Sequence, residues 1–445
     1  MESAPRTETT QSGRRLFQLK FLILAAAIWH VSITVSVFVA GKYGLMPAQI
    51  YPSGIGRFAS DGVIYQGQVA ELCQVMKNEG PLAWATWPTQ LHVRLYSLPL
   101  FVVSRWFAFN ILTIEPLNLI YYLGILILVF KLGESIFDYR AGLIAAGVVG
   151  LWPTFLLHTT QLLRDPLLVL CVLVFTWSIA ESLRTDLGWR QGLRLGIAAG
   201  TAIVAIRITR QPMWYLLVAG VAGATVLMIF RAVRERHAAA GTALFAVLII
   251  AAMIVTPGFQ PYFHNQQDSR IATTLPANVD TLPIPEQISA RRAGFRIKIE
   301  EGRIVPATDG SKIDADVKLN SSTEIIQHLP RAIMVGLFAP FPNMWWQTGK
   351  EVGSGGRLIS GFETLLTYML ECLALYGLWR GRRSFPAWFI FGFAVLGAIA
   401  LGLVVTNVGA LYRLRYPFWT LMVILAVGGL ELLRARLSKS KPVTG

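Results

Sequence analysis

Long apolar runs, separated by short polar and basic stretches, dominate the pattern of this chain. Examples are Phe21–Ala40, Leu117–Phe130, Leu167–Ile179 and Ala387–Thr406. Segments of roughly 17–25 such residues are long enough to cross a bilayer as helices. The pattern therefore predicts an all-α, polytopic membrane protein.

The basic residues between the runs predict the orientation of the helices, because loops rich in Lys and Arg face the cytoplasm. The clusters that fit this side are Arg14/Arg15/Lys20, Lys131–Arg140, Arg184/Arg190/Arg194, Arg231/Arg234/Arg236, Arg380/Arg382/Arg383 and Arg434–Lys441. Placing all of them in the cytoplasm predicts about ten transmembrane helices, with both termini on that side. The predicted crossings lie near 19–41, 116–136, 141–160, 166–183, 193–209, 213–230, 240–258, 357–379, 386–406 and 416–433.

One further apolar segment, Tyr96–Leu112, would reverse the side of everything after it if it crossed the membrane. It contains Arg105 and follows Trp84 and Trp87. Aromatic and amphipathic segments favour the headgroup region. We therefore expect a juxtamembrane helix here, with an eleventh crossing as the alternative.

These crossings divide the chain into three predicted units and leave two large loops on the outer side. The units are 1–258, an N-terminal transmembrane module with the first outer loop at 42–115; 259–356, a large extracytoplasmic loop; and 357–445, the C-terminal transmembrane helices.

The large loop is rich in Pro, Gly, Asn and Asp, which punctuate short elements of structure. A hairpin is predicted at Arg296–Lys298 and Arg303–Val305, and a helix near Ser322–Val335. The final part, Leu337–Trp346, is expected to be an interfacial aromatic segment. The loop is therefore expected to be one large α/β-containing insert.

Charge and motifs exclude several classes of function. The formal net charge is +15, but no continuous basic stripe with interleaved aromatic residues is present, as a nucleic-acid surface would need. No Gly-rich phosphate loop, HExxH, GxSxG or CxxC pair occurs, so nucleotide hydrolysis, zinc proteolysis and serine hydrolysis have no support.

Two acidic residues, Asp61 and Asp165, fall on the outer face in this topology. A charge near hydrocarbon is costly, so ionisable groups gathered there usually mark chemistry or transport. Asp61 precedes a predicted helix at Tyr65–Lys77 and is either a general base or a turn or N-cap residue. Asp165 follows Arg164 and either lines a site or caps a helix that begins at Pro166.

Arginines at the outer ends of the helices break the bias of positive charge toward the cytoplasm. They are Arg207, Arg210, Arg413 and Arg415. Guanidinium groups suit phosphate oxygens, so an anionic phosphate near the membrane surface is the favoured partner. The alternatives are lipid headgroups and the acidic side chains of the outer face.

Other polar side chains keep two interpretations each. Glu363 and Glu371 share a face of the eighth crossing, where function and packing are both open. His158 is expected to be a hydrogen-bonded interfacial histidine rather than a metal ligand. Arg292 belongs to a basic cluster that either reaches the membrane surface or forms a solvated helix face, and the solvated face is favoured.

Taken together, these residues resemble the GT-C superfamily of integral-membrane glycosyltransferases. That superfamily includes protein O-mannosyltransferases, aminoarabinose transferases and bacterial proteins like glycosyltransferase family 39. The resemblance rests on Asp61 in the first outer loop, on the stretch Thr159–Pro166, on the late outer loop and on Arg413-Leu-Arg415-Tyr-Pro. The Pro-Phe-Pro-x-x-Trp piece within Leu337–Trp346 is also similar. The chain departs from better-known members because Gly62, not a second acid, follows Asp61.

The resemblance implies a reaction and a place for it. A sugar would move from a polyprenyl-phosphate-linked donor to a glycan, lipid or protein acceptor, outside the cytoplasm and most simply at a bacterial inner membrane. Asp61 would be the general base of an inverting displacement, and Asp165 would orient the acceptor or help to hold a divalent cation. No cofactor is required by these residues. The side chains implied for the donor phosphate are Arg164, Arg207, Arg210, Arg413 and Arg415.

Two rival functions stay open. An O-antigen-type polymerase or ligase would depend on arginines within 259–356 and could dispense with Asp61. A transporter or flippase of lipid-linked substrates would place paired ionisable residues at the midplane on broken helices. Glu371 alone fits that pattern in the sequence.

Overall fold

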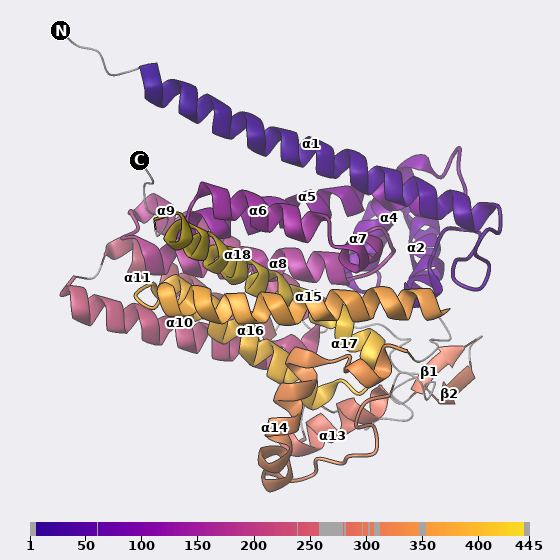
Figure 1. The fold of residues 1–445 in the computed structure, drawn as a ribbon. Coiled ribbons are helices and arrows are strands. Elements are labelled where there is room, and N and C mark those ends of the chain that lie inside the picture. The colour runs from indigo at the N-terminus through magenta and orange to yellow at the C-terminus, as the bar shows by residue number, and fades with distance from the viewer. Residues whose placement is uncertain are drawn as a thin grey trace.

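The computed structural model describes residues 6–59, 61–237, 239–257, 279, 282–295, 297–300, 303–306, 312–346 and 353–439. Long helices run side by side in one bundle, and a smaller group made of α13, α14, β1 and β2 lies at its side (Figure 1). The chain is an all-α polytopic membrane protein. The helices of the bundle are α1 (Arg6–Lys42), α5 (Ile111–Ile136), α6 (Tyr139–Gly150), α7 (Pro153–Thr159), α8 (Asp165–Arg184), α9 (Trp189–Thr209), α10 (Trp214–Glu235), α11 (Ala240–Val255), α15 (Gly353–Arg380), α16 (Phe385–Val404) and α18 (Tyr416–Lys439).

Within the described ranges, 8 helices are long and apolar enough to cross a membrane. The helices α6 and α7 are bent by 69° at a short break, where Pro153 begins a new helix, and they count as a ninth span when the pair is taken together. The one remaining expected crossing, 240–258, corresponds to α11. This helix has 16 residues and is shorter than the roughly 20 residues that a span needs. The expected ten crossings are therefore eight full helices, one broken span and one short helix.

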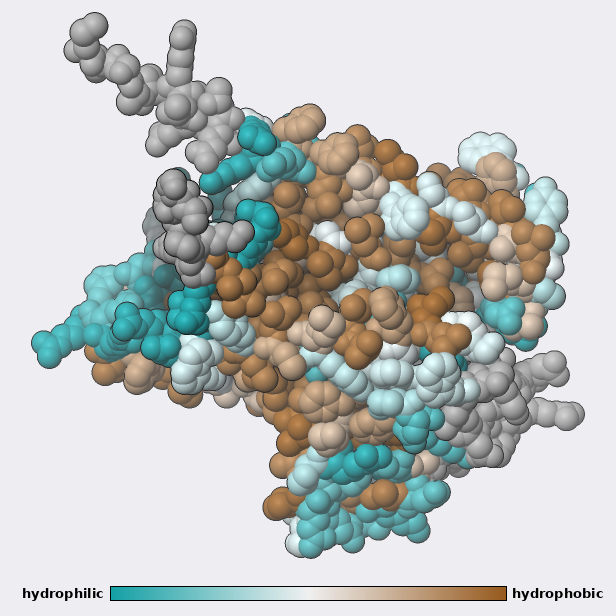
Figure 2. All heavy atoms as spheres, viewed as in Figure 1, coloured by the Kyte–Doolittle hydropathy of each residue, from teal (hydrophilic) through white to brown (hydrophobic). Residues whose placement is uncertain are grey.

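The distribution of apolar and polar side chains on the surface fits a membrane protein. Hydrophobic side chains cover the broad middle of the bundle, whereas hydrophilic ones gather at the end near the termini and around α14 (Figure 2). Large apolar side chains such as Phe21, Leu24 and Ile254 are exposed on helices of the bundle, which hydrocarbon rather than water would surround in a bilayer.

A short apolar helix lies in the segment where a juxtamembrane helix is expected, with different bounds. It is α4 (Leu91–Val103), a helix of 13 residues that is about 20 Å long at a rise of 1.5 Å per residue. The hydrocarbon core is about 30 Å thick, so α4 is too short for an eleventh crossing. The predicted end at Leu112 was wrong, because Asn110 accepts a hydrogen bond from the Leu112 amide and starts α5.

The basic clusters meet at one end of the bundle, where both termini also lie (Figure 1). Arg140 of α6 pairs with Glu431 of α18 at 3.2 Å, and Arg231 of α10 pairs with Asp186 at 2.8 Å. The opposite end, called the distal end below, holds α2 (Asp61–Asn78), α3 (Pro81–Thr86), α4, α7 and α17 (Val408–Leu414). The short elements beside them are η1 (Arg57–Ala59), η2 (Gln211–Met213) and η6 (Pro342–Met344).

The region of the predicted large loop contains α13 (Ile284–Gly294), β1 (Ile297–Glu300), β2 (Arg303–Pro306) and α14 (Ser322–Phe338). The two strands pair antiparallel, from Ile297 opposite Pro306 to Glu300 opposite Arg303, where the sequence predicts a hairpin. A capping box of Ser321 and Glu324 starts α14.

Helix α14 is anchored to the bundle by close contact with α16. A Cβ added to Gly336 would lie 2.0 Å from the Ala398 carbonyl oxygen, and one added to Gly402 would lie 2.0 Å from that of Ala332. The two backbones therefore approach as closely as glycine permits. This contact fixes the C-terminal end of α14, near Phe338.

Candidate active site

Three charged side chains from distant parts of the chain meet at the distal end. Asp61 lies in the first turn of α2 and accepts a hydrogen bond from Arg413 of α17, with 2.9 Å between Nη2 and Oδ2. The other terminal nitrogen of Arg413, Nη1, lies 3.9 Å from Oδ2 of Asp165. One guanidinium group therefore lies between the two carboxylates that the sequence places on one face.

The three side chains differ in their access to solvent. Asp61 is 41% exposed, whereas Arg413 is 14% and Asp165 8% exposed. Oδ1 of Asp61 accepts no hydrogen bond from the described residues. Asp61 is thus the member of the cluster that a substrate can reach, and Asp165 is its inner partner.

Asp165 does not cap α8, contrary to one of its two predicted interpretations. Helix α8 begins at Asp165 itself, Arg164 is the residue before the helix, and no side chain there accepts a capping hydrogen bond. Pro166 occupies the first turn as expected. The carboxylate faces Arg413 instead, 3.9 Å from its Nη1.

Two further arginines act on Asp61. Its enclosure by protein raises the pKa of the Asp61 carboxyl, but Arg413, Arg164 and Arg210 outweigh that effect and hold the pKa below its usual value. Asp61 is therefore ionised at neutral pH. The three guanidinium groups exceed the two carboxylates by one unit of charge, which favours an anionic ligand.

Tyr65 and His92 also belong to this cluster and were missed in the sequence. Tyr65 lies four residues after Asp61 on α2, so both share one face of that helix. Its ring packs edge-on against the His92 ring, with 4.4 Å between centroids. The i, i+4 spacing in a predicted helix could have identified Tyr65, whereas the contact with His92 of α4 is tertiary.

Buried polar groups hold the connection between α7 and α8 and thereby fix Asp165. The amide of Gly56 donates to Oε1 of Gln161 at 2.8 Å, and Asn118 donates to the Gln161 carbonyl at 3.3 Å. The Tyr96 hydroxyl lies 2.6 Å from Oδ1 of Asn118 and 3.1 Å from the Leu163 carbonyl. Because Gly56 lies in the loop before Asp61, Gln161 links the two acidic segments directly.

Glu363 is a structural anchor of the same end rather than an exposed site residue. It is 1% exposed. Its carboxylate accepts hydrogen bonds from the Thr154 amide at 2.8 Å and from the Tyr412 hydroxyl at 2.5 Å. Tyr412 directly precedes Arg413, so Glu363 fixes the segment that carries the central guanidinium.

His158 is hydrogen-bonded, as the sequence predicts. Its Nδ1 lies 2.6 Å from the Thr154 carbonyl and 2.9 Å from the Tyr416 hydroxyl. Its ring also packs edge-on against Phe58. These contacts hold α7 against α18 and the loop before α2.

A buried pair inside the membrane was not foreseen. His30 of α1 lies 2.8 Å from Glu115 of α5 and 3.2 Å from the Thr159 hydroxyl. Thr34 donates to the second Glu115 oxygen at 2.8 Å. Each partner is nearly or fully buried. The network ties α1 and α5 to the end of α7 at Thr159, two residues before Gln161 and five before Arg164.

Two of the arginines predicted to hold phosphate lie elsewhere. Arg207 donates to the Gln211 carbonyl at 3.1 Å and lies over the Trp214 ring at 5.3 Å. Arg415 is 6% exposed and donates to the carbonyls of Leu337 and Ala339 at 2.7 and 2.8 Å. Arg413 and Arg415 are two residues apart, or about 200° around a helix, so they face different neighbours.

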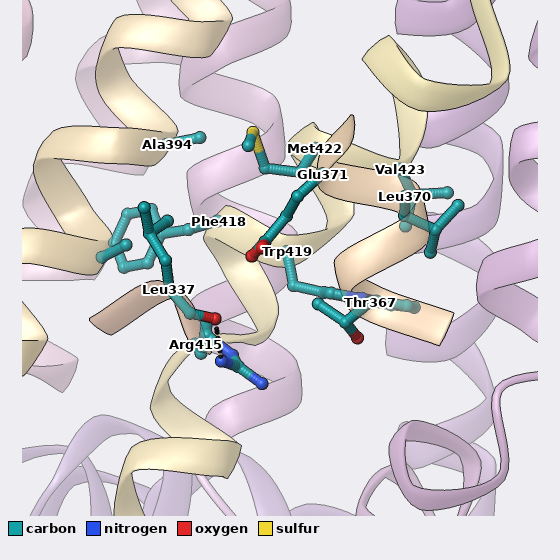
Figure 3. A pocket seen from close by; sticks show the side chains of 11 residues that line it. Leu337, Thr367, Leu370, Glu371, Ala394, Arg415, Phe418, Trp419, Met422 and Val423 are labelled. Carbon is teal, nitrogen blue, oxygen red and sulfur yellow. Dashed lines mark hydrogen bonds between the residues drawn. The ribbon is translucent and has the colours of Figure 1, made fainter. Parts of the chain in front are cut away.

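Arg415 borders a small cavity that also receives Glu371 (Figure 3). The cavity measures about 20 Å³ and is otherwise lined largely by apolar side chains such as Phe418 and Met422. That volume suits about one water molecule. In the figure the Glu371 carboxylate extends toward the side where Arg415 lies. The packing interpretation that the sequence left open for Glu371 fits this placement.

Arg292 contradicts the favoured expectation of a solvated helix face. It is 1% exposed and donates to three carbonyls, those of Asp314 at 2.6 Å, Leu403 at 2.7 Å and Val317 at 3.2 Å. Charge-assisted hydrogen bonds compensate the cost of burying the guanidinium. Arg292 therefore joins α13 to the end of α16 instead of facing water.

Among the residues that the structure describes, no group of three or more His, Cys, Asp or Glu side chains is arranged to hold a metal ion. The position between Asp61 and Asp165 is taken by the guanidinium of Arg413. The resemblance allowed a divalent cation beside Asp165, and the described residues contain no set of side chains that would hold one.

No family model matches the chain. No curated protein matches it either. Among solved structures, the chain is similar to the archaeal oligosaccharyltransferase AglB from Archaeoglobus fulgidus, solved with an inhibitory peptide and a dolichol-phosphate, with a TM-score of 0.48 and 12% identity. The match covers 96% of this chain and 52% of that one, so the chain spans about half the length of AglB. We base no argument about family, activity or residue roles on this match.

Proposed function

We propose that this chain is a membrane glycosyltransferase that uses a polyprenyl-phosphate-linked sugar and acts at the extracytoplasmic face. The observation that carries the proposal is the cluster of Asp61, Arg413 and Asp165, with Arg164 and Arg210 beside it. An accessible carboxylate next to an excess of guanidinium groups suits a reaction that takes a proton from one substrate and leaves negative charge on another.

In this mechanism the acceptor hydroxyl approaches Oδ1 of Asp61, which accepts its proton as the acceptor oxygen bonds to the anomeric carbon. The bond from that carbon to the phosphate oxygen breaks, and the electron pair stays on the phosphate. Arg413, Arg164 and Arg210 stabilise this growing charge. Attack from the face opposite the leaving phosphate inverts the anomeric carbon.

Arg413 would have a second duty in this reaction. Its hydrogen bond to Oδ2 of Asp61 keeps that carboxylate ionised and oriented, while Asp165 balances the guanidinium from the buried side. A carboxylate with a lowered pKa is a weak base in the ground state. It suffices here because the acidity of the acceptor hydroxyl rises as its bond to the sugar forms.

The extracytoplasmic placement follows from charge. The end of the bundle that holds Arg140 and Arg231 is rich in Lys and Arg, which is typical of a cytoplasmic side. The cluster lies at the distal end and would therefore face outward, most simply across a bacterial inner membrane. Glycan, lipid and protein remain the acceptor classes that the geometry admits.

The test replaces Asp61→Asn in cells that lack the native copy, at matched protein level. We expect loss of the glycosylated product at the cell surface and accumulation of the polyprenyl-phosphate-linked sugar. Arg331→Gln, which breaks an ion pair with Asp314 remote from the cluster, is the control and retains the product. Full product with Asp61→Asn would refute the assignment, and loss with no accumulated donor would favour a transporter.

A further inference from the structure

The Tyr65 side chain has an unusual combination of burial and polarity. The residue is 7% exposed, and it packs in the apolar cluster that also contains Val69, Leu72 and Tyr96. No described residue donates or accepts a hydrogen bond at its hydroxyl. The hydroxyl oxygen is not one of the fully enclosed polar atoms that lack a partner, so it is accessible and free to donate to a ligand.

Tyr65 lies within electrostatic reach of the charged cluster. Tyr65 interacts electrostatically with Arg164, Asp61, Asp165 and Arg413, and Arg210 interacts with Tyr65 in turn. Burial raises the pKa of Tyr65 to about 12, with Arg164 opposing and the two carboxylates adding to the rise. The hydroxyl therefore keeps its proton at physiological pH and acts as a neutral donor.

The ring is fixed, so the hydroxyl has a defined direction. One side of α2 carries both Asp61 and Tyr65, and the His92 ring lies edge-on against Tyr65. His92 is fully buried. Burial, with Arg164 in support and Asp61 opposed, lowers the pKa of His92 well below its usual value. Contact with the buried, uncharged His92 ring restricts the rotamers of Tyr65 and places no charged group on that side of the tyrosine ring.

We propose that the Tyr65 hydroxyl donates a hydrogen bond to the phosphate of the polyprenyl carrier and so completes the phosphate subsite formed by Arg164, Arg210 and Arg413. This inference rests on the proposed function and adds one group to it. The phosphate is favoured over the acceptor because the surrounding charges leave an excess of one positive unit. Tyr65 transfers no proton: the carbon–oxygen bond breaks, the phosphate keeps the electron pair, and Asp61 takes the acceptor proton.

The test measures binding of undecaprenyl phosphate to the purified full-length chain in phosphatidylcholine vesicles. We expect Tyr65→Phe to weaken this binding about tenfold, because a hydrogen bond to a charged group is lost while the ring is kept. Binding of undecaprenol, which has no phosphate, is expected to be unchanged. Equal binding of undecaprenyl phosphate by both proteins would overturn the assignment.

Tyr121→Phe is the matched control. Tyr121 is 4% exposed, belongs to the same apolar cluster, and has a buried hydroxyl without a partner among the described residues. It lies on α5, away from the charged cluster. We expect its variant to bind undecaprenyl phosphate like the wild type, and an equal loss in both variants would refute a specific role for Tyr65.

Two further arms separate the possible failures. Inorganic phosphate at the concentration of the lipid should not displace undecaprenyl phosphate, and equal competition would overturn the carrier as the source of the phosphate. Asp61→Asn should lose transfer but retain undecaprenyl phosphate binding. If the wild type fails to bind undecaprenyl phosphate, the proposed function itself is refuted; if it binds and Tyr65→Phe binds equally, only the role of Tyr65 is.

Discussion

Arg413→Gln is the substitution that reports most directly on the charged cluster. It removes the only group that contacts both Asp61 and Asp165 within the described residues. Arg413 holds the pKa of Asp61 down, together with Arg164 and Arg210 and against the effect of burial. Its removal must therefore raise the pKa of Asp61.

The size of the change follows from the geometry. Two unit charges 4 Å apart interact by about 4 kcal/mol at an effective dielectric constant of about 20, and by about 1 kcal/mol in water. Asp61 is 41% exposed, so solvent screens the pair and about 1–2 kcal/mol is the reasonable range. One pKa unit corresponds to 1.36 kcal/mol, so we expect a rise of about one unit.

The assay is the pH dependence of sugar transfer in membranes. Asp61 acts as a base only when ionised, so activity falls as the pH drops through its pKa. The acid limb of kcat/KM should move to higher pH by about one unit in Arg413→Gln. Arg331→Gln removes an equivalent ion pair with Asp314 and should leave the limb in place. An unmoved or lowered acid limb in Arg413→Gln would refute the electrostatic coupling.

Three other substitutions test the supports of the site. Arg292→Met leaves three buried carbonyls without a donor and should lower the free energy of unfolding by about 1–3 kcal/mol for each carbonyl left unsatisfied, measured by thermal unfolding in detergent. Arg234→Met, at an exposed position, should change it little. Gly336→Ala places a Cβ 2.0 Å from the Ala398 oxygen and should cost about 1–3 kcal/mol by overpacking; Gly147→Ala, with nothing within 4 Å, is its neutral control. Gln161→Leu should reduce kcat more than thermal stability, and a purely parallel loss would argue against its link between the acidic segments.

Much of the fold was predictable because hydrophobic thickness and charge asymmetry act locally. Nine of the ten expected crossings each correspond to one helix and the tenth, 141–160, to the bent pair of α6 and α7; Asp61 and Asp165 lie at one end of the bundle, as the parity of the basic clusters predicted. The bend between α6 and α7 and the shortness of α11 were not foreseen. The hydrophobic pattern predicts where apolar segments lie. It does not predict that Pro153 breaks a helix, or that α11 is short and packs against α9.

The site was less predictable because its contacts join residues that are far apart in the chain. Asp61 and Arg413 are 352 residues apart, and the sequence alone left open whether that arginine faces phosphate or a carboxylate. Arg292 illustrates the same limit, since its buried carbonyl partners come from Val317 and Leu403. Helical geometry could have separated Arg413 from Arg415, because residues two apart do not share a face.

The central claim is tested most directly by transfer in a purified system. The chain is reconstituted in phosphatidylcholine vesicles with the lipid-linked sugars and membrane acceptors extracted from cells that lack it, and the release of polyprenyl phosphate is measured. The account predicts release by the wild type and none above background by Asp61→Asn, although that variant still binds undecaprenyl phosphate. Release at equal rates by both proteins, or no release by a folded wild type, would contradict it.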